Sequence, residues 1–395
     1  MSTPTGKAAD GHAMSEMAST YLDALRAGGA NLVIVAHVLG LYFGIHSGVM
    51  TRMGHLGVAI FFLLSGFLIM QSLLNWLNKP EPRLPGFLAD RVARIMTPYV
   101  PALILIALAN VWIAGNHSEG GVNTGVLTFI GNLLLLQDHA VFQALDSVGM
   151  DVAWRIRSYN SAEPFWTVAI EMWIYVFMGL FMFWVLKRER IDRWIGTALA
   201  AVALPVLIWN AAAGGGKSLT LIWLLGATAG YLFQVWRADG YRNIRSVGAM
   251  LVVFGGAGLI GRAVKIGFHP YDFQTATLIA LVMFGVLALL MCVQSAPAVL
   301  RRSVNFLAAY SYSLYLIHNT ALILVLEHVR TESTWAHIAI GVIAAHGCAY
   351  LLYLAFERHY RLVGRWLRPK FERALAPRGV RQSSSAAADL VRQER

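Results

Sequence analysis

Charged side chains are scarce in this chain of 395 residues, where Asp, Glu, Lys and Arg together make up 13%. Soluble domains carry about 25% of these residues, so a soluble globular fold of this length is excluded. Hydrophobic residues reach 57%, and the mean hydropathy is +0.57. This composition predicts an all-α fold, a polytopic membrane helical bundle of about ten transmembrane helices plus one short, partly embedded segment.

Cysteine is nearly absent as well. The two cysteines, Cys292 and Cys348, lie inside apolar runs and form no CxxC pair, so we expect neither a disulfide framework nor a metal site. Residues 1–20 lack the hydrophobic run of a cleavable signal peptide, so the first span is expected to be retained. The GGGKS run at 214–218 lacks the earlier glycine of a phosphate-binding loop, because that position is Ala211, and it predicts only a short turn.

Apolar runs of spanning length recur along the chain. About 20 such residues are needed to cross the hydrocarbon core as a helix. The predicted spans are residues 29–45, 55–77, 95–115, 165–186, 194–213, 219–236, 247–263, 275–293, 305–327 and 336–356. A further run at 122–137 is shorter and carries four polar residues, so its crossing has to be decided by charge.

Basic residues outnumber acidic ones by 32 to 21, and the excess does not require a nucleic-acid partner. It gathers in five segments: 79–94, 187–193, 237–245, Arg301–Arg302 and the tail from Arg358. If 122–137 does not fully cross, all five segments fall on one side of the membrane together with both termini. The positive-inside rule favours that arrangement, with ten crossings and both ends cytoplasmic.

The same pattern divides the chain into three parts. We expect a polar cytoplasmic N-terminal segment at 1–20, a transmembrane domain at 21–370 and a disordered basic cytoplasmic tail at 371–395. The longest outward connection, roughly 138–164, has mixed charge and several aromatic residues. It suits either a lid over a polar ligand or a solvated loop with interfacial aromatics.

A single imidazole stands in the middle of the first span. His37 follows Arg26 by eleven residues, or about 16 Å along a helix. An ionisable side chain at that depth is costly and marks a functional site by default. The alternative is a core histidine that packs and hydrogen-bonds.

Two arginines begin the third span. Arg91 and Arg94 are three residues apart and share a helix face, and Arg26 lies at the same predicted mouth. Guanidinium groups gathered in this way would clamp an anionic ligand such as a phosphate. For any one of these arginines, the alternative is ordinary positive-inside charge.

Polar side chains also enter the fourth and the next-to-last spans. Glu171 is about five residues below Trp166, hence roughly 7 Å inside the outer aromatic belt. Tyr315 and His318 lie on one face of SYSLYLIHNT. A carboxylate bonded to His37 would fix its tautomer and stabilise the imidazolium. These groups predict a polar channel, with the arginines at its cytoplasmic mouth, His37 midway and Glu171 nearer the outside. It suits group transfer from a phosphate-bearing donor to a hydroxyl, and a proton-coupled membrane transporter fits almost as well.

Five blocks in order resemble the acyltransferase 3 family of membrane-bound acyl transferases, over roughly residues 20–320. Arg26 and His37 resemble the arginine–histidine pair that opens the family. The other blocks are LGVAIFFLLSGFLI at 56–69, FLADRVARIMTPYVPALI at 87–104, FWTVAIEMWIYVFM at 165–178 and the SYSLYLIHNT run. Two positions depart from the family pattern: Ala59 replaces an acidic residue, and Met172 replaces the second carboxylate of a pair.

The resemblance implies a transferase that moves an acyl group, expected to be acetyl, from cytoplasmic acyl-CoA to a hydroxyl of a cell-surface or secreted carbohydrate. Acyl-CoA would be a donor substrate, with no permanently bound cofactor, and the partners would be the bilayer and the glycan, with no nucleic acid. By resemblance, His37 would be the catalytic base, Glu171 its helper, and Arg26, Arg91 and Arg94 the phosphate ligands, supported by Trp166, Ser65, Tyr315 and His318.

Two further implications follow from the resemblance. The acceptor could instead be an intracellular small metabolite such as a macrolide, and the oligomeric state stays open. We also expect a self-contained transferase in the inner membrane of a prokaryote, without the appended hydrolase-like domain of some relatives.

Overall fold

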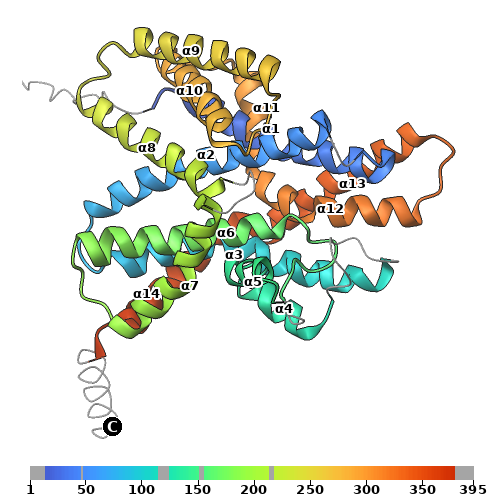
Figure 1. Cartoon of the computed structure of the whole chain (residues 1–395), viewed down its shortest axis with the longest axis horizontal. Helices are drawn as coiled ribbons and strands as arrows, with labels where there is room; N and C mark the ends of the chain where they lie inside the picture. Colours follow the sequence, from blue (N-terminus) through green and yellow to red (C-terminus); the bar gives the residue numbers. More distant parts are fainter. Residues whose placement is uncertain (1–13, 46–47, 114–123, 151–154, 213–217, 379–395) are drawn as a thin grey trace, which may run out of the picture.

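The computed structural model describes residues 14–45, 48–113, 124–150, 155–212 and 218–378, and within these ranges it contains helices and no strand (Figure 1). The all-α membrane bundle is therefore confirmed. The longer helices are α1 (Glu16–Phe43), α2 (Val49–Leu77), α3 (Arg83–Ala109), α6 (Phe165–Gly179), α7 (Arg193–Ala212), α8 (Leu219–Ala238), α9 (Ile244–Lys265), α10 (Phe273–Leu290) and α13 (Thr334–Ala355). Helix α6 continues as a π-helical stretch, Leu180–Leu186.

Among the described residues, 9 helices are long and apolar enough to cross a membrane, or up to 10 if one bent pair counts as a span. The bent pair is α11 (Ala298–Ala309) and α12 (Ser311–His328), which meet at 58°. Each of the ten predicted spans overlaps one of these elements. The bend at Tyr310 was not predicted, because a kinked span and a straight one have the same hydropathy.

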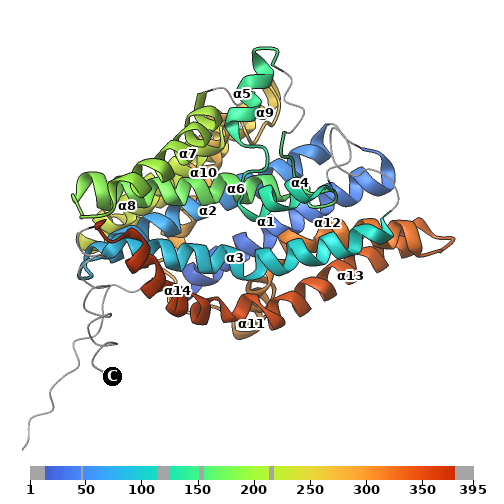
Figure 2. The same ribbon diagram turned by 90° about the horizontal axis from the view of Figure 1, so that it is seen from below.

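The predicted short segment at 122–137 contains α4 (Val126–Leu133), and residues 122–123 lie outside the described residues. Eight residues of helix extend about 12 Å, well short of a hydrocarbon core of about 30 Å. A second short helix, α5 (Ala140–Ser147), follows it. Both belong to a group of short segments beside the long helices (Figure 2).

Close helix packing depends on glycine at two crossings. A Cβ on Gly66 of α2 would lie 2.0 Å from the Trp223 carbonyl oxygen of α8, so only glycine allows this approach. Leu63 and Phe67 of α2 meet Gly226 and Gly230 of α8 in the same order, so α2 and α8 run parallel.

The second crossing joins α1 and α2. Gly29 of α1 meets Gly57 of α2, and Ala36 meets Gly54, so these two helices run antiparallel. The antiparallel contact places the beginning of α1 beside the end of α2.

The basic segments gather at one end of the bundle. The Glu189 carboxylate accepts hydrogen bonds from the backbone N–H groups of Arg83 (2.9 Å) and Leu84 (3.0 Å), and so joins the 187–193 segment to the start of α3. The N–H of Asp192 donates to the carbonyl of Leu375 at 2.8 Å, which joins the same segment to the C-terminal helix α14 (Tyr360–Leu375).

Two more basic segments lie at this end. Helix α8 is parallel to α2, so the 237–245 segment follows it there. Glu16 begins α1 and pairs with Arg301. All five basic segments therefore share one end of the described structure, as the sequence predicted.

Three boundaries differ from the predicted ones. Helix α3 begins at Arg83, inside the predicted 79–94 loop, so Arg91 and Arg94 lie within the helix rather than at its start. Helix α1 begins at Glu16, inside the segment expected at 1–20. Helix α14 packs beside one end of α3 and runs to Leu375, so residues 371–375 of the tail expected to be disordered are helical (Figure 2). Helix α14 is amphipathic and rich in arginine, and a hydropathy pattern alone does not reveal such a helix.

Candidate active site

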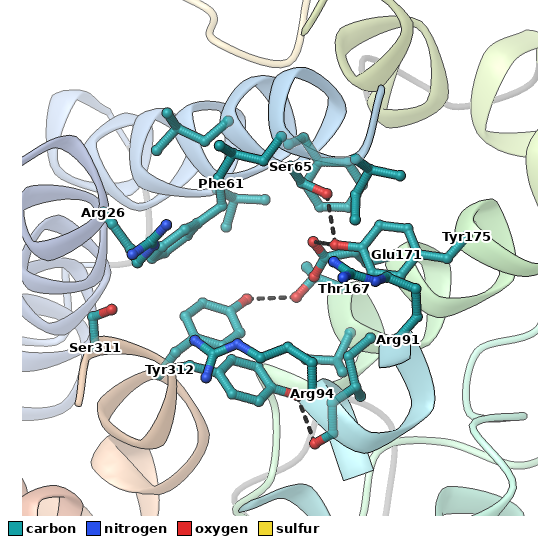
Figure 3. A pocket seen from close by; sticks show the side chains of 18 residues that line it. Arg26, Phe61, Ser65, Arg91, Arg94, Thr167, Glu171, Tyr175, Ser311 and Tyr312 are labelled. Atoms are coloured by element: carbon teal, nitrogen blue, oxygen red, sulfur yellow. Dashed lines mark hydrogen bonds between the residues drawn. The ribbon is translucent and has the colours of Figure 1, made fainter. Parts of the chain in front are cut away.

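A cavity of about 180 Å³ lies between α1, α2, α3, α6 and α12 (Figure 3). Its lining includes six of the residues singled out from the sequence: Arg26, Ser65, Arg91, Arg94, Glu171 and Tyr315. The remaining three, His37, Trp166 and His318, do not line it. The sequence-predicted site thus divides into a cavity and a second group around His37.

Three arginines project into the cavity, Arg26 from α1 and Arg91 with Arg94 from α3 (Figure 3). Arg26 pairs with Asp23 at 2.9 Å, and Arg94 pairs with Glu357 at 2.9 Å. Arg91 differs, because its buried Nε has no hydrogen-bond partner among the described residues. A buried N–H left unpaired is costly, so the Arg91 guanidinium is less fully satisfied within the protein than those of Arg26 and Arg94.

Glu171 lies on the same cavity, in a chain of hydrogen bonds. The Tyr175 hydroxyl donates to the Glu171 carboxylate, and Ser65 Oγ lies 2.8 Å from the Tyr175 hydroxyl oxygen. Trp223 Nε1 donates to Ser65 Oγ at 3.0 Å. Each donor in this chain points toward Glu171, so the network stabilises its carboxylate.

The structure does not bring Glu171 to His37, contrary to the pairing that the sequence suggested. Among the described residues, no hydrogen bond or ion pair joins the two side chains. The physical reason is the rotation of α6. Its face carrying Glu171 and Tyr175 points toward Ser65 of α2 and into the cavity, not toward His37.

His37 has three polar neighbours of its own. The centroids of the His37 and His318 rings lie 5.0 Å apart in a T-shaped contact. Glu163 Oε2 lies 3.9 Å from His37 Nδ1, and the side chain of Asn319 lies beside the imidazole. The His37 side chain is 21% exposed.

The tautomer of His318 follows from its contacts. Its Nδ1 lies 2.9 Å from the Leu314 carbonyl oxygen and 3.0 Å from that of Tyr315. Carbonyl oxygens only accept, so Nδ1 carries the hydrogen and Nε2 keeps its lone pair. This Nε2 is buried and has no hydrogen-bond partner among the described residues.

Tyr315 lies between the cavity and the histidine pair formed by His37 and His318. It lines the cavity, and its ring centroid lies 6.1 Å from that of His318. Thr167 Oγ1 donates to the Pro164 carbonyl at 2.9 Å, so the Tyr315 hydroxyl is the donor in its 2.6 Å bond to Thr167. Trp166 is half-buried beside the core and lies outside the cavity lining.

Sequence reasoning missed Glu163 and Asn319 as neighbours of His37. From the sequence, Glu163 was expected only to contribute to the mixed charge of the 138–164 connection, with no role beside His37. A carboxylate directly before the span that carries Trp166 and Glu171 was the available signal. Part of that connection, residues 151–154, lies outside the described residues, while residue 156 and residues 158–162 are buried in the bundle. The second half of the connection is therefore packed against helices, whereas residues 147–150 are exposed.

Comparison with known proteins gives one match. A family model described as an acyltransferase domain matches residues 19–354. No curated protein and no solved structure matches the chain.

Proposed function

The chain belongs to the acyltransferase 3 family, and from this premise we propose that it transfers an acyl group, expected to be acetyl, from cytoplasmic acyl-CoA to a hydroxyl of a cell-surface or secreted carbohydrate. Membership itself makes it an acyltransferase with many apolar helices of membrane-spanning length. The donor, the acceptor and the orientation in the membrane belong to the proposal. Membership also decides against the transporter that the polar residues alone left open.

The arginine cavity is the observation that carries the donor assignment. Coenzyme A bears several phosphate oxygens, and guanidinium groups bind such oxygens with paired, charge-assisted hydrogen bonds. Arg26, Arg91 and Arg94 come from two helices to one cavity, and Arg91 has a buried N–H without a partner among the described residues. We assign Glu171 to this donor cavity rather than to His37.

In the proposed reaction, the imidazole of His37 acts as a general base. His37 takes the proton of the acceptor hydroxyl as its oxygen attacks the thioester carbonyl. A carbon–oxygen bond forms and the carbon–sulfur bond breaks, and the leaving thiolate takes the proton back from the imidazolium. The products are the acyl ester and free coenzyme A. Tyr315 lies between the cavity and the histidine pair, which supports a thioester path from the arginines toward His37.

The shared end of the basic segments supports an orientation with that end, and both termini, in the cytoplasm of a prokaryote. His37 then lies about 16 Å further along α1 than Arg26, toward the other face. A hydroxyl that reaches His37 from that face fits a glycan acceptor. The family also leaves room for an intracellular small metabolite, such as a macrolide, as the acceptor.

Release of free coenzyme A by the purified protein tests the proposal. The protein is incubated with acetyl-CoA and a panel of acceptors, one set of glycans and one set of macrolides. The expected result is coenzyme A release that depends on a glycan, with the labelled acyl group recovered on that glycan. Transfer to macrolides alone would overturn the acceptor assignment, and no acceptor-dependent release would overturn the transferase proposal.

A further inference from the structure

The connection between α5 and α6 enters the helical bundle before α6 begins. Ser158, Asn160, Ser161 and Ala162 are all buried, and Ser161 is 0% exposed. A polar, irregular segment can be buried in a bundle only if its backbone groups find partners. The contacts of this segment therefore show what holds it.

Two neighbouring residues of α12 hold the segment. Ser161 Oγ lies 2.8 Å from Thr320 Oγ1, and Asn319 Nδ2 donates to the Ser161 carbonyl at 2.9 Å. On the other side, Asn132 Nδ2 donates to the Arg157 carbonyl at 2.8 Å. Residues 157–161 are thereby fixed between α4 and α12.

This anchoring fixes the backbone two residues before Glu163. Glu163 Oε2 lies 3.9 Å from His37 Nδ1, and His318 is the other titratable side chain facing the His37 ring. Asn319 both anchors the segment and lies beside His37, so the docking of the segment and the surroundings of His37 depend on the same residue.

We propose that Glu163 is the carboxylate that positions His37 for the transfer reaction. A carboxylate only accepts hydrogen bonds, so it favours the tautomer with hydrogen on Nδ1, which leaves the lone pair on Nε2 for the acceptor hydroxyl. As His37 takes that proton, the negative charge of Glu163 stabilises the imidazolium. The distance of 3.9 Å shortens to a hydrogen bond when substrate is bound, as catalytic contacts commonly do.

The inference rests on the proposed function, and Glu163→Gln tests it. Glutamine keeps the shape and one accepting oxygen but removes the charge. The matched control is Glu332→Gln, which makes the same change at an exposed position in the α12–α13 connection. The assay is transfer of labelled acetyl from acetyl-CoA to the glycan acceptor by the full chain, with kcat and the KM for acetyl-CoA determined separately.

The expected result for Glu163→Gln is a fall in kcat of about tenfold or more, while the KM for acetyl-CoA stays within about twofold. Glu332→Gln is expected to match the wild type. Unchanged kcat in Glu163→Gln would overturn the inference and leave the proposed function intact. If His37→Ala retains full turnover, the proposed base is wrong, which is a separate failure.

Glu163→Asp separates positioning from a merely structural role. Aspartate keeps the charge but is shorter by one methylene, so it is expected to restore part of the kcat that Glu163→Gln loses. The Glu163 side chain is 41% exposed, so both Glu163 variants are expected to fold and to unfold at the wild-type temperature. A loss of folded protein with normal kcat per folded molecule would overturn the inference, as would an aspartate variant no better than glutamine.

Discussion

The three arginines of the cavity have different partners, and substituting each one with alanine should reveal the difference. Arg91 has a buried Nε without a partner among the described residues, whereas Arg94 is paired with Glu357. Arg91→Ala is expected to weaken donor binding without destabilising the fold. Arg94→Ala is expected to destabilise the fold as well, because it removes the ion-pair partner of the buried Glu357 carboxylate, which then keeps only its hydrogen bonds from Ser313.

The expected losses of donor affinity and of unfolding free energy follow from how each arginine is paired and buried. Hydrogen bonds to charged groups contribute about 1.5–3 kcal/mol, which corresponds to a weakening of the donor Kd by roughly 10- to 100-fold in Arg91→Ala. Glu357 is 0% exposed, and breaking a buried ion pair costs about 3–5 kcal/mol. The Arg94 side chain is 33% exposed, so the lower end, about 3 kcal/mol of unfolding free energy, is expected for Arg94→Ala.

Two measurements on each purified variant distinguish the effects: binding of labelled acetyl-CoA at low and high salt, and thermal unfolding in detergent. Salt is expected to weaken binding, because the phosphate contacts are ionic and partly open to solvent. Arg245→Ala is the control, since Arg245 is exposed at the same basic end and lies outside the cavity lining. The double variant Arg94→Ala/Glu357→Gln is expected to recover stability, because the stranded carboxylate is then neutral.

Two results would contradict these assignments of the arginines. Unchanged acetyl-CoA binding in Arg91→Ala, Arg94→Ala and Arg26→Ala would reduce the three arginines to markers of topology. If Arg91→Ala were the least stable variant and Arg94→Ala unfolded like the wild type, the assignment of Glu357 as the buried partner of Arg94 would be wrong.

Two further predictions concern the fold around the cavity. Tyr175→Phe removes the donor to Glu171 and is expected to lower the unfolding free energy by about 1–3 kcal/mol. The measurement is thermal unfolding, with Tyr231→Phe as the exposed control. Equal stability of the two variants would contradict the hydrogen-bond network around Glu171. Gly66→Ala places a Cβ against the Trp223 carbonyl and is expected to abolish monodisperse protein in size-exclusion chromatography. In the control Gly28→Ala, the added Cβ meets no atom within 4 Å, so this variant is expected to be tolerated. A well-folded Gly66→Ala would contradict the close crossing of α2 and α8.

The spans and the arginine cavity could be predicted because their signals are local. Runs of apolar residues mark the helices, and a spacing of three places Arg91 and Arg94 on one face whatever surrounds them. Hydropathy also identified the span at 305–327, but not the bend between α11 and α12, since bending leaves composition unchanged. Helix α14 was missed because its polar face resembles a solvated tail.

The neighbours of His37 could not be predicted in the same way. Depth along a helix can be counted from the sequence, and it correctly separates His37 from Arg26. The rotation of each helix depends on packing between distant segments, so counting could not show that the face of α6 carrying Glu171 and Tyr175 lies against Ser65 of α2 rather than His37. Nor could it show that Glu163 reaches His37, because this depends on the anchoring of Ser161 by α12.

The central claim is that His37 is the base of the transfer reaction, and replacing it tests that claim most directly. Transfer of labelled acetyl from acetyl-CoA to the acceptor is measured for the wild type, for His37→Ala, and for His269→Ala as an exposed histidine control. A fall of about 100-fold or more is expected in His37→Ala alone, with acetyl-CoA still bound and the protein still folded. Turnover by folded His37→Ala at the wild-type rate would contradict the claim.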